Sequence, residues 1–179
     1  SGNRITPHSS YVHVTGVIDR SGSMYSAAEG TWTGLKKLLE RFIKMGRGPD
    51  CSVRVKLVTF DDKIECPEIP EDPTELTDDD YECLRSAIFP RNMTSLYDAL
   101  GFAITEHRKR YKTFVGGLNR KVRNIAEIDQ FIFVITDGIE NSSQKYTHEM
   151  IRSYIKEDQA NGVKYIFVGA NINATKTGG

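Results

Sequence analysis

The chain has 179 residues, enough for one domain with a substantial core and short for two. It carries 24 basic and 24 acidic residues, so its net charge favours no class of partner. It contains no apolar run of about 18 residues and no charged start followed by an apolar stretch. The sequence therefore predicts neither a membrane span nor a signal peptide.

The first predicted elements are a strand, an amphipathic helix and a second strand. Residues 11–18 are rich in β-branched side chains and end at a turn, which is typical of a strand. Within 32–45, apolar residues recur at steps of three and four, which predicts a helix that glycines and Pro49 terminate. Residues 53–60 alternate between apolar and polar side chains and predict a strand. The short segment 63–66 follows an acidic turn, which indicates an antiparallel edge hairpin.

The second half of the chain continues the alternation. We expect a short helix over 79–87 and a longer one over 95–111. The apolar run 131–136 predicts a central strand that is covered on both faces. Thr147 is the expected N-cap of a helix that buries Met150, Ile151, Tyr154 and Ile155, and residues 163–168 form the last clear strand. This order predicts an α/β layered domain with a mostly parallel sheet.

Three separated segments place oxygen-bearing side chains at strand or helix ends. The first strand runs into Asp19-x-Ser21-x-Ser23, Thr94 precedes the 95–111 helix, and Asp137 follows the central strand. If the first and central strands are neighbours, the winding direction of the sheet reverses between them, and ligands collect at such a crevice. Two carboxylates and three hydroxyls are hard donors that suit Mg²⁺. Gly22 fits a tight loop that leaves room for the ion.

These five residues resemble the metal-ion-dependent adhesion site of the von Willebrand factor A family, and they match all five of its positions. The resemblance extends from Val12 to Ala170. It implies a Rossmann-like, doubly wound fold with strand order 3-2-1-4-5, helices on both faces and an antiparallel edge strand. It also implies a final helix and strand, for which little chain remains after Val168.

The same resemblance implies the roles of the residues. Ser21, Ser23 and Thr94 would contact Mg²⁺, with Mn²⁺ or Ca²⁺ as substitutes, and Asp19 and Asp137 would act through water. A Glu or Asp of a protein partner would complete the coordination. We therefore expect a protein-binding adaptor module and no enzymatic activity.

Four segments are similar to the intracellular, tellurium-resistance-associated branch of bacterial and phage members: VIDRSGSM, VTFDD, TSLYDAL and FVITDGIEN. This similarity implies a cytoplasmic location in a bacterium or a phage-infected cell. The cysteines, Cys51, Cys66 and Cys83, lack Cys-x-x-Cys spacing, which argues against zinc and favours buried thiols in a reducing cytoplasm. One disulfide plus one free thiol is the alternative.

Residues 1–10 are interpreted as an N-terminal extension, in which Ser1-Gly2 is typical of a cloning remnant, and residues 11–179 as one domain. The ending Gly178-Gly179 resembles a cloning boundary and leaves open a longer natural chain. The sequence predicts no particular oligomeric state.

An alternative function is a metal-dependent phosphatase or phosphotransferase with Asp19 as nucleophile. Haloacid-dehalogenase-type enzymes need a second Asp two residues further on, where this chain has Ser21. Receiver domains need a further acidic pair that the sequence does not offer, and no phosphate-binding Gly-x-x-x-x-Gly-Lys loop occurs. These departures argue against catalysis.

A second alternative is a module that binds through charge. The segment 108–123 holds seven basic residues and no acid, whereas 61–82 holds eleven acids and only Lys63 as a base. Solvated surface is the simpler interpretation. The functional interpretations are docking of nucleic acid or an acidic partner on the basic segment, and self-association between the two segments. Tyr111 and Phe114 are the only aromatic side chains near the basic stretch, which argues against nucleic acid.

Single residues carry weaker predictions. His13 is expected to be structural, and His107 and His148 to be exposed on helices. Trp32 is expected to pack in the core. Tyr25, just after the serine loop, is a weaker candidate for the rim of the site.

Overall fold

The structure, a computed structural model, describes residues 10–138 and 140–169. Its five-stranded sheet has the order β3-β2-β1-β4-β5, in which β3 is antiparallel to β2 and the other pairs are parallel. The predicted strand order and antiparallel edge are confirmed. The strands are β1 (Ser10–Asp19), β2 (Cys51–Phe60), β3 (Ile64–Glu65), β4 (Glu127–Thr136) and β5 (Val163–Gly169).

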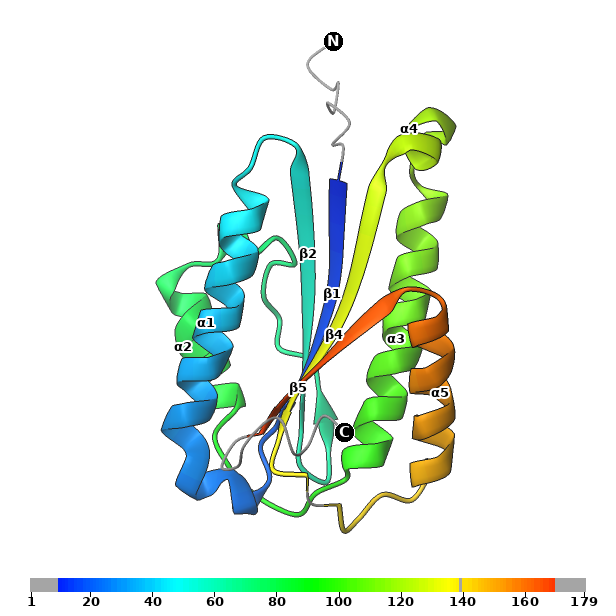
Figure 1. Cartoon of the computed structure of the whole chain (residues 1–179). Coiled ribbons are helices and arrows are strands. Elements are labelled where there is room, and N and C mark those ends of the chain that lie inside the picture. Colours follow the sequence, from blue (N-terminus) through cyan, green and yellow to red (C-terminus); the bar gives the residue numbers. More distant parts are fainter. Residues whose placement is uncertain (1–9, 139, 170–179) are drawn as a thin grey trace.

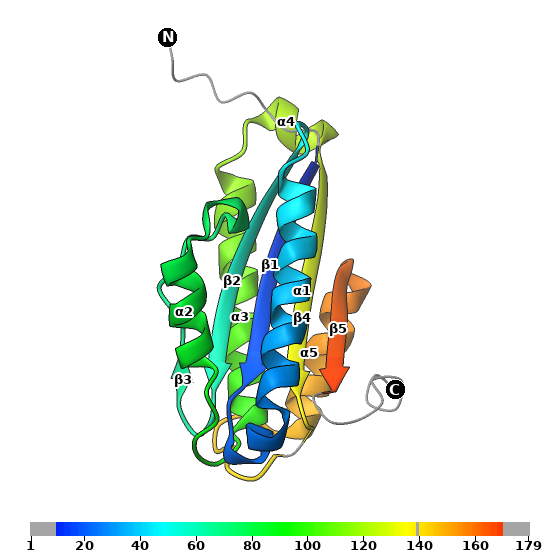
Figure 2. The same cartoon turned by 90° about the vertical axis from the view of Figure 1, so that its left-hand side faces the viewer.

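Helices cover both faces of the sheet (Figure 1). Two of them, α1 and α2, lie on one face, and α3 and α5 lie on the other (Figures 1 and 2). Their bounds are α1 (Ala28–Gly46), α2 (Asp78–Ala87), α3 (Leu96–Gly116), α4 (Arg120–Ile125) and α5 (His148–Ala160), with 3₁₀ turns at η1 (Gly22–Ala27) and η2 (Pro73–Glu75).

Strand β1 lies at the centre of the sheet and supplies both cores. Val14 and Ile18 belong to the cluster under α1, whereas Val17 belongs to the cluster under α3 and α5. Alternate residues of a strand point to opposite faces, so one continuous buried strand serves both layers. The core therefore holds the carboxyl end of β1, which carries Asp19, in a fixed position.

Most predicted elements are confirmed, and the differences have physical reasons. Helix α4 was not predicted, since none of its residues is buried and no apolar periodicity marks it. Strand β4 begins at Glu127 rather than at Phe131. The sequence did not indicate its first residues because they are exposed or half-buried and form no apolar run. Met150 is exposed on α5, contrary to prediction, while the N-cap at Thr147 is confirmed.

His107 was predicted to be exposed and is buried. It lies against His13, with ring centroids 4.7 Å apart. Its Nδ1 is 2.7 Å from Thr15 Oγ1, and its Nε2 is 3.0 Å from Gln130 Oε1. A polar cluster thus fills part of the space between β1 and α3, and apolar periodicity does not reveal it. The structural role of His13 and the exposure of His148 agree with prediction.

The three cysteines are free thiols, but none is buried: Cys51 and Cys66 are partly exposed and Cys83 is exposed. The expectation of buried thiols is therefore wrong. Trp32 is half-buried and packs against the core, close to Tyr81.

No helix within the described residues has the length and apolar content to cross a membrane. The described part of the chain ends with β5 at Gly169. The closing helix and strand expected after Val168 would fall on residues 170–179, which lie outside the described residues.

Candidate metal centre

The predicted ligands gather at the carboxyl end of the sheet. Strands β1 and β4 are parallel neighbours, so the loops that follow them start side by side. The chain passes from β1 to α1 on one face and from β4 to α5 on the other (Figure 1). The winding direction therefore reverses between β1 and β4, where doubly wound sheets bind ligands.

Asp19 is the most firmly held member of the site. It is fully buried, with 0% of its surface exposed. Its Oδ1 accepts a hydrogen bond of 2.8 Å from the Ser21 amide, and its Oδ2 accepts one of 2.8 Å from the Thr136 hydroxyl. Burial raises the pKa of Asp19, the hydrogen bonds from Ser21 and Thr136 partly offset this, and the nearby Asp137 raises it further. The site thus concentrates negative charge in a poorly solvated place.

Ser21 and Ser23 lie next to each other. Their hydroxyl oxygens are 3.0 Å apart, with Ser21 buried and Ser23 exposed. Adjacent ligands of an octahedral Mg²⁺ at 2.0–2.1 Å are separated by about 2.9 Å. The two hydroxyls are therefore spaced as neighbouring ligands of one such ion.

Asp137 approaches the same place from β4. It directly follows Thr136, whose hydroxyl binds Asp19, and its charge acts on the Asp19 carboxylate. Gly138 then takes a positive φ of 83° and donates its amide to Thr136 Oγ1. A positive φ directly after Asp137 favours glycine at this position.

The loop that carries Thr94 contacts both other loops. On one side, Arg91 N donates to Arg20 O at 2.8 Å and Gly22 N donates to Asn92 O at 2.7 Å. On the other side, the amide of the buried Thr94 donates to Asn141 Oδ1 at 2.9 Å. The three predicted segments are thus connected by hydrogen bonds, with the Thr94 loop in the middle.

Gly22 also lies in close contact with the Thr94 loop, which the sequence does not indicate. A Cβ at this position would lie 3.2 Å from the carbonyl oxygen of Arg91 and 3.4 Å from that of Asn92. Glycine at this position therefore allows the loop that carries Ser21 and Ser23 to approach the Thr94 loop closely.

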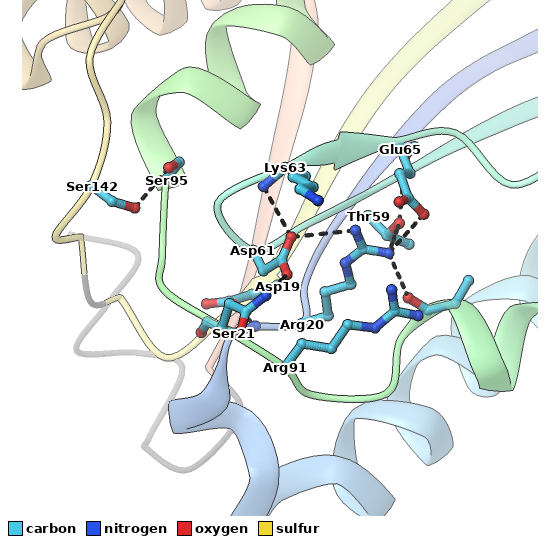
Figure 3. Close-up of polar contacts among 12 residues, drawn as sticks. Asp19, Arg20, Ser21, Thr59, Asp61, Lys63, Glu65, Arg91, Ser95 and Ser142 are labelled. Atoms are coloured by element: carbon cyan, nitrogen blue, oxygen red, sulfur yellow. Dashed lines mark hydrogen bonds and ion pairs between the residues drawn. The ribbon is translucent and has the colours of Figure 1, made fainter.

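Arg20 and Asp61 form a buried ion pair behind the site (Figure 3). Arg20 Nη2 is 3.3 Å from Asp61 Oδ1, and the two side chains are 1% and 2% exposed. Arg20 Nη1 also binds Glu65 at 2.9 Å. Asp61 accepts from the Lys63 amide, and its carbonyl oxygen accepts from the Ser95 amide at 2.8 Å. This pair joins the serine loop, the β2–β3 hairpin and the start of α3.

Sequence reasoning did not identify these supporting residues. Arg20 occupies a variable position of Asp-x-Ser-x-Ser, and Asp61 was interpreted only as part of a turn. Asn141 and the Thr136 hydroxyl were not considered either. The available signal was an arginine two residues after the apolar pair Val17-Ile18, where an unpaired buried charge would be costly.

The donor set consists of oxygen atoms and suits a hard cation rather than zinc. Within the described residues, no three His, Cys, Asp or Glu side chains cluster as a metal site would require. Three of the five predicted donors are neutral hydroxyls, which bind an ion without reducing its charge.

The charged stretches pair within the chain. Arg110 of α3 binds Glu71 with an N–O distance of 3.0 Å, and Arg108 binds Asp158 at 2.8 Å. The basic and acidic segments are thus linked to each other intramolecularly through Arg110 and Glu71. Because these side chains are paired within the chain, part of the charge that a docking patch would need is already neutralised.

Comparison with known proteins gives a family match and similar folds. A family model described as von Willebrand factor type A domain matches residues 13–177. No curated protein sequence matches the chain.

Three solved structures have similar folds. The manganese-loaded TRAP protein of Plasmodium vivax is 17% identical, with a TM-score of 0.55 and coverage of 94% of this chain and 60% of that one. Proximal thread matrix protein 1 from the mussel byssus is 17% identical, with a TM-score of 0.54 and coverage of 90% and 36%. BatB of Bacteroides thetaiotaomicron is 17% identical, with a TM-score of 0.51 and coverage of 88% and 66%. The chain spans less than two thirds of each of these proteins.

Proposed function

Because the chain belongs to the von Willebrand factor type A family, we propose that its three loops bind one Mg²⁺ ion and use it to capture an acidic side chain of a partner protein. Ser21, Ser23 and Thr94 supply hydroxyl ligands, and Asp19 and Asp137 supply the anchoring charge. Mn²⁺ and Ca²⁺ would bind as substitutes. The observation that carries the proposal is the 3.0 Å separation of the two serine hydroxyls directly beside the buried Asp19.

Electrostatics supports a cation at this place. The Asp19 carboxylate is buried and close enough to Asp137 for their charges to repel. A bound cation removes this repulsion and compensates for the lost hydration of Asp19. A relative of the same fold, the TRAP protein of Plasmodium vivax, is manganese-loaded.

The same donor set supports binding rather than catalysis. An ion that is held mainly by neutral hydroxyls remains electropositive, and magnesium keeps positions for exogenous ligands. A carboxylate from outside is a strong ligand for such a position. The chain's own residues would hold the ion, and the exposure of Ser23 would let a ligand from solvent approach it.

Removal of the Ser23 hydroxyl tests the metal site. Ser23 is exposed, so Ser23→Ala deletes one ligand without opening a cavity in the core. We expect calorimetric titration with MgCl₂ to show a loss of affinity of at least about tenfold, which corresponds to about 1.4 kcal/mol, because one inner ligand is missing. Thr33→Ala, which removes an exposed hydroxyl from α1, is the matched control and retains wild-type affinity.

Two results would contradict the proposal. One is that the wild-type protein produces no heat when it is titrated with MgCl₂, and the other is that Ser23→Ala binds Mg²⁺ with wild-type affinity. Asp19→Ala is a poorer test of the metal site. Asp19 accepts two hydrogen bonds in a fully buried place, so its loss leaves the Ser21 amide and the Thr136 hydroxyl unpaired and destabilises the fold itself.

The proposal includes the absence of catalysis. A phosphotransferase that uses Asp19 needs a second acid two residues away, and Ser21 occupies that position with its hydroxyl against Ser23. Incubation with phosphomonoesters and Mg²⁺ is expected to give no turnover. Turnover that Ser23→Ala abolishes would establish an enzyme instead.

We further propose that the domain acts in the cytoplasm of a bacterium or phage-infected cell, as the similarity to the tellurium-resistance-associated branch implies. Three free thiols, one of them exposed, fit a reducing compartment. Fractionation of cells that express the tagged natural protein tests this location.

A further inference from the structure

Three large, exposed apolar side chains lie in the two loops that carry Ser23 and Thr94, two of the proposed metal ligands. Tyr25, Phe89 and Met93 are 69%, 58% and 53% exposed. Large side chains of this kind are normally scattered over the surface, and a group of them marks an interaction site. Tyr25 follows the proposed ligand Ser23 by two residues, and Met93 precedes the proposed ligand Thr94.

The three side chains belong to two loops that are in contact. The rings of Tyr25 and Phe89 pack edge to face, with centroids 6.4 Å apart. Gly22, at the start of the turn that carries Tyr25, donates its amide to Asn92, the neighbour of Met93. Both loops lie at the same end of the sheet (Figure 2). We refer to Tyr25, Phe89 and Met93 as the apolar rim.

The polypeptide around the rim is poor in charge. Residues 21–27 and 89–95 contain one charged side chain, Arg91, and it is exposed. Arg91 lies beside the Arg20 cluster in Figure 3. A bound divalent cation would balance Asp19 and Asp137, so Arg91 is the charge that remains on these two loops. The surface is then apolar with a metal position open to an outside ligand, and it complements a segment that is acidic and apolar.

We infer that the partner presents its metal-binding carboxylate next to aromatic or large aliphatic side chains, which pack on the apolar rim while the carboxylate reaches the ion. This inference rests on the proposed metal site. The ion selects for the acid, and Tyr25 and Phe89 select among acidic segments. Apolar side chains near the centre of an interface contribute most of the binding energy, so the rim determines which proteins bind.

The test is a selection of random twelve-residue peptides on the immobilised full chain, in MgCl₂ and in chelator. We expect peptides with Asp or Glu adjacent to Phe, Tyr, Trp, Leu or Met to be enriched in MgCl₂ only. The double variant Tyr25→Ser/Phe89→Ser should lose the apolar preference and bind the wild-type peptides at least about tenfold more weakly. Its affinity for Mg²⁺ alone should be unchanged.

Ile125→Ser is the matched control. It removes a side chain that is 80% exposed on α4, at the opposite end of the sheet, and should select the same peptides as wild type (Figure 1). Thermal unfolding of all variants checks that the fold is retained.

Three results would overturn the inference. Acidic peptides without apolar neighbours, enriched in MgCl₂, would refute the role of the rim and leave the proposed function intact. Apolar peptides enriched equally in chelator would mean that the rim binds independently of the ion. Mg²⁺-dependent self-association in sedimentation, lost in the double variant, would make a second copy of the chain the occupant. Failure to bind Mg²⁺ at all would instead refute the proposed function.

Discussion

Arg20 is a fully buried cation, although it stands at a variable position of a surface motif. Its guanidinium contacts Asp61 and Glu65, and the Nε atom has no hydrogen-bond partner among the described residues. Burial alone would raise the pKa of Asp61, but the Lys63 amide and the charge of Arg20 lower it overall. The two charges therefore depend on each other, and together they orient the backbone from which Asp19 and Ser21 project.

Removal of one member of this pair should be costly. In Arg20→Met the buried Asp61 carboxylate loses its partner, and we expect the free energy of unfolding to fall by about 3–5 kcal/mol. Urea denaturation at pH 7 in chelator measures this change. The double variant Arg20→Met/Asp61→Asn should lose less than the sum of the two single variants. A loss below about 1 kcal/mol in Arg20→Met would contradict a buried pair and indicate an exposed one.

At the scale of elements, apolar patterning predicts those that are buried and misses those that are not. Leu35, Leu39 and Phe42 recur at helical spacing, and α1 buries all three. No residue of α4 is buried, so no pattern was there to find. The residues of the candidate site also fall into a group that the sequence predicts and a group that it does not. The motif residues were predictable from their positions at strand ends, whereas Arg20 depends on partners that only tertiary structure brings together.

Gly16 in β1 shows how closely the central strands pack. A Cβ at Gly16 would lie 2.2 Å from Phe133 Cζ, and Phe133 is fully buried against Phe42. Phe133 cannot move without disturbing the core under α1, so Gly16→Ala should destabilise the protein by about 1–3 kcal/mol in urea denaturation.

Gly34 provides the contrast, because nothing lies within 4 Å of a Cβ built there in the middle of α1. Gly34→Ala should stabilise the protein by about 0.5–1 kcal/mol through helix propensity. Equal effects of the two substitutions would contradict the packing of Phe133 on β1.

At the scale of the whole molecule, the polar cluster between β1 and α3 couples the fold to pH. Burial lowers the pKa of His13 to about 3, helped by the charges of Arg110 and His107. Burial likewise lowers the pKa of His107 to about 4. The hydrogen bond that His107 Nε2 donates to Gln130 Oε1 opposes this shift, and the charge of Arg110 adds to it. Arg110 forms an ion pair with Glu71 and donates a hydrogen bond of 2.9 Å to Thr15 Oγ1. Both imidazoles are therefore neutral in the folded protein at neutral pH.

The sign of the pH effect follows from these directions. Below pH 6.5 the unfolded chain binds protons on both histidines, and the folded chain does not until the pH is near 4. Above pH 7 the two histidines should therefore not reduce the free energy of unfolding. As the pH decreases from about 6.5 to 4, the free energy of unfolding should fall by up to about 1.4 kcal/mol per pH unit for each histidine. The carboxylates whose pKa values are lowered, Asp61 and Glu65, lose their contribution only at lower pH.

Urea denaturation at pH 7, 6 and 5 in chelator measures this slope without a contribution from the metal equilibrium. His107→Gln keeps a polar side chain beside Thr15 and removes one titrating group, so its slope should be about half that of wild type. His148→Gln, on the exposed start of α5, should keep the wild-type slope. A flat profile for the wild-type protein between pH 7 and 5 would show that the two imidazoles are solvated, which would contradict the packing of α3 on β1.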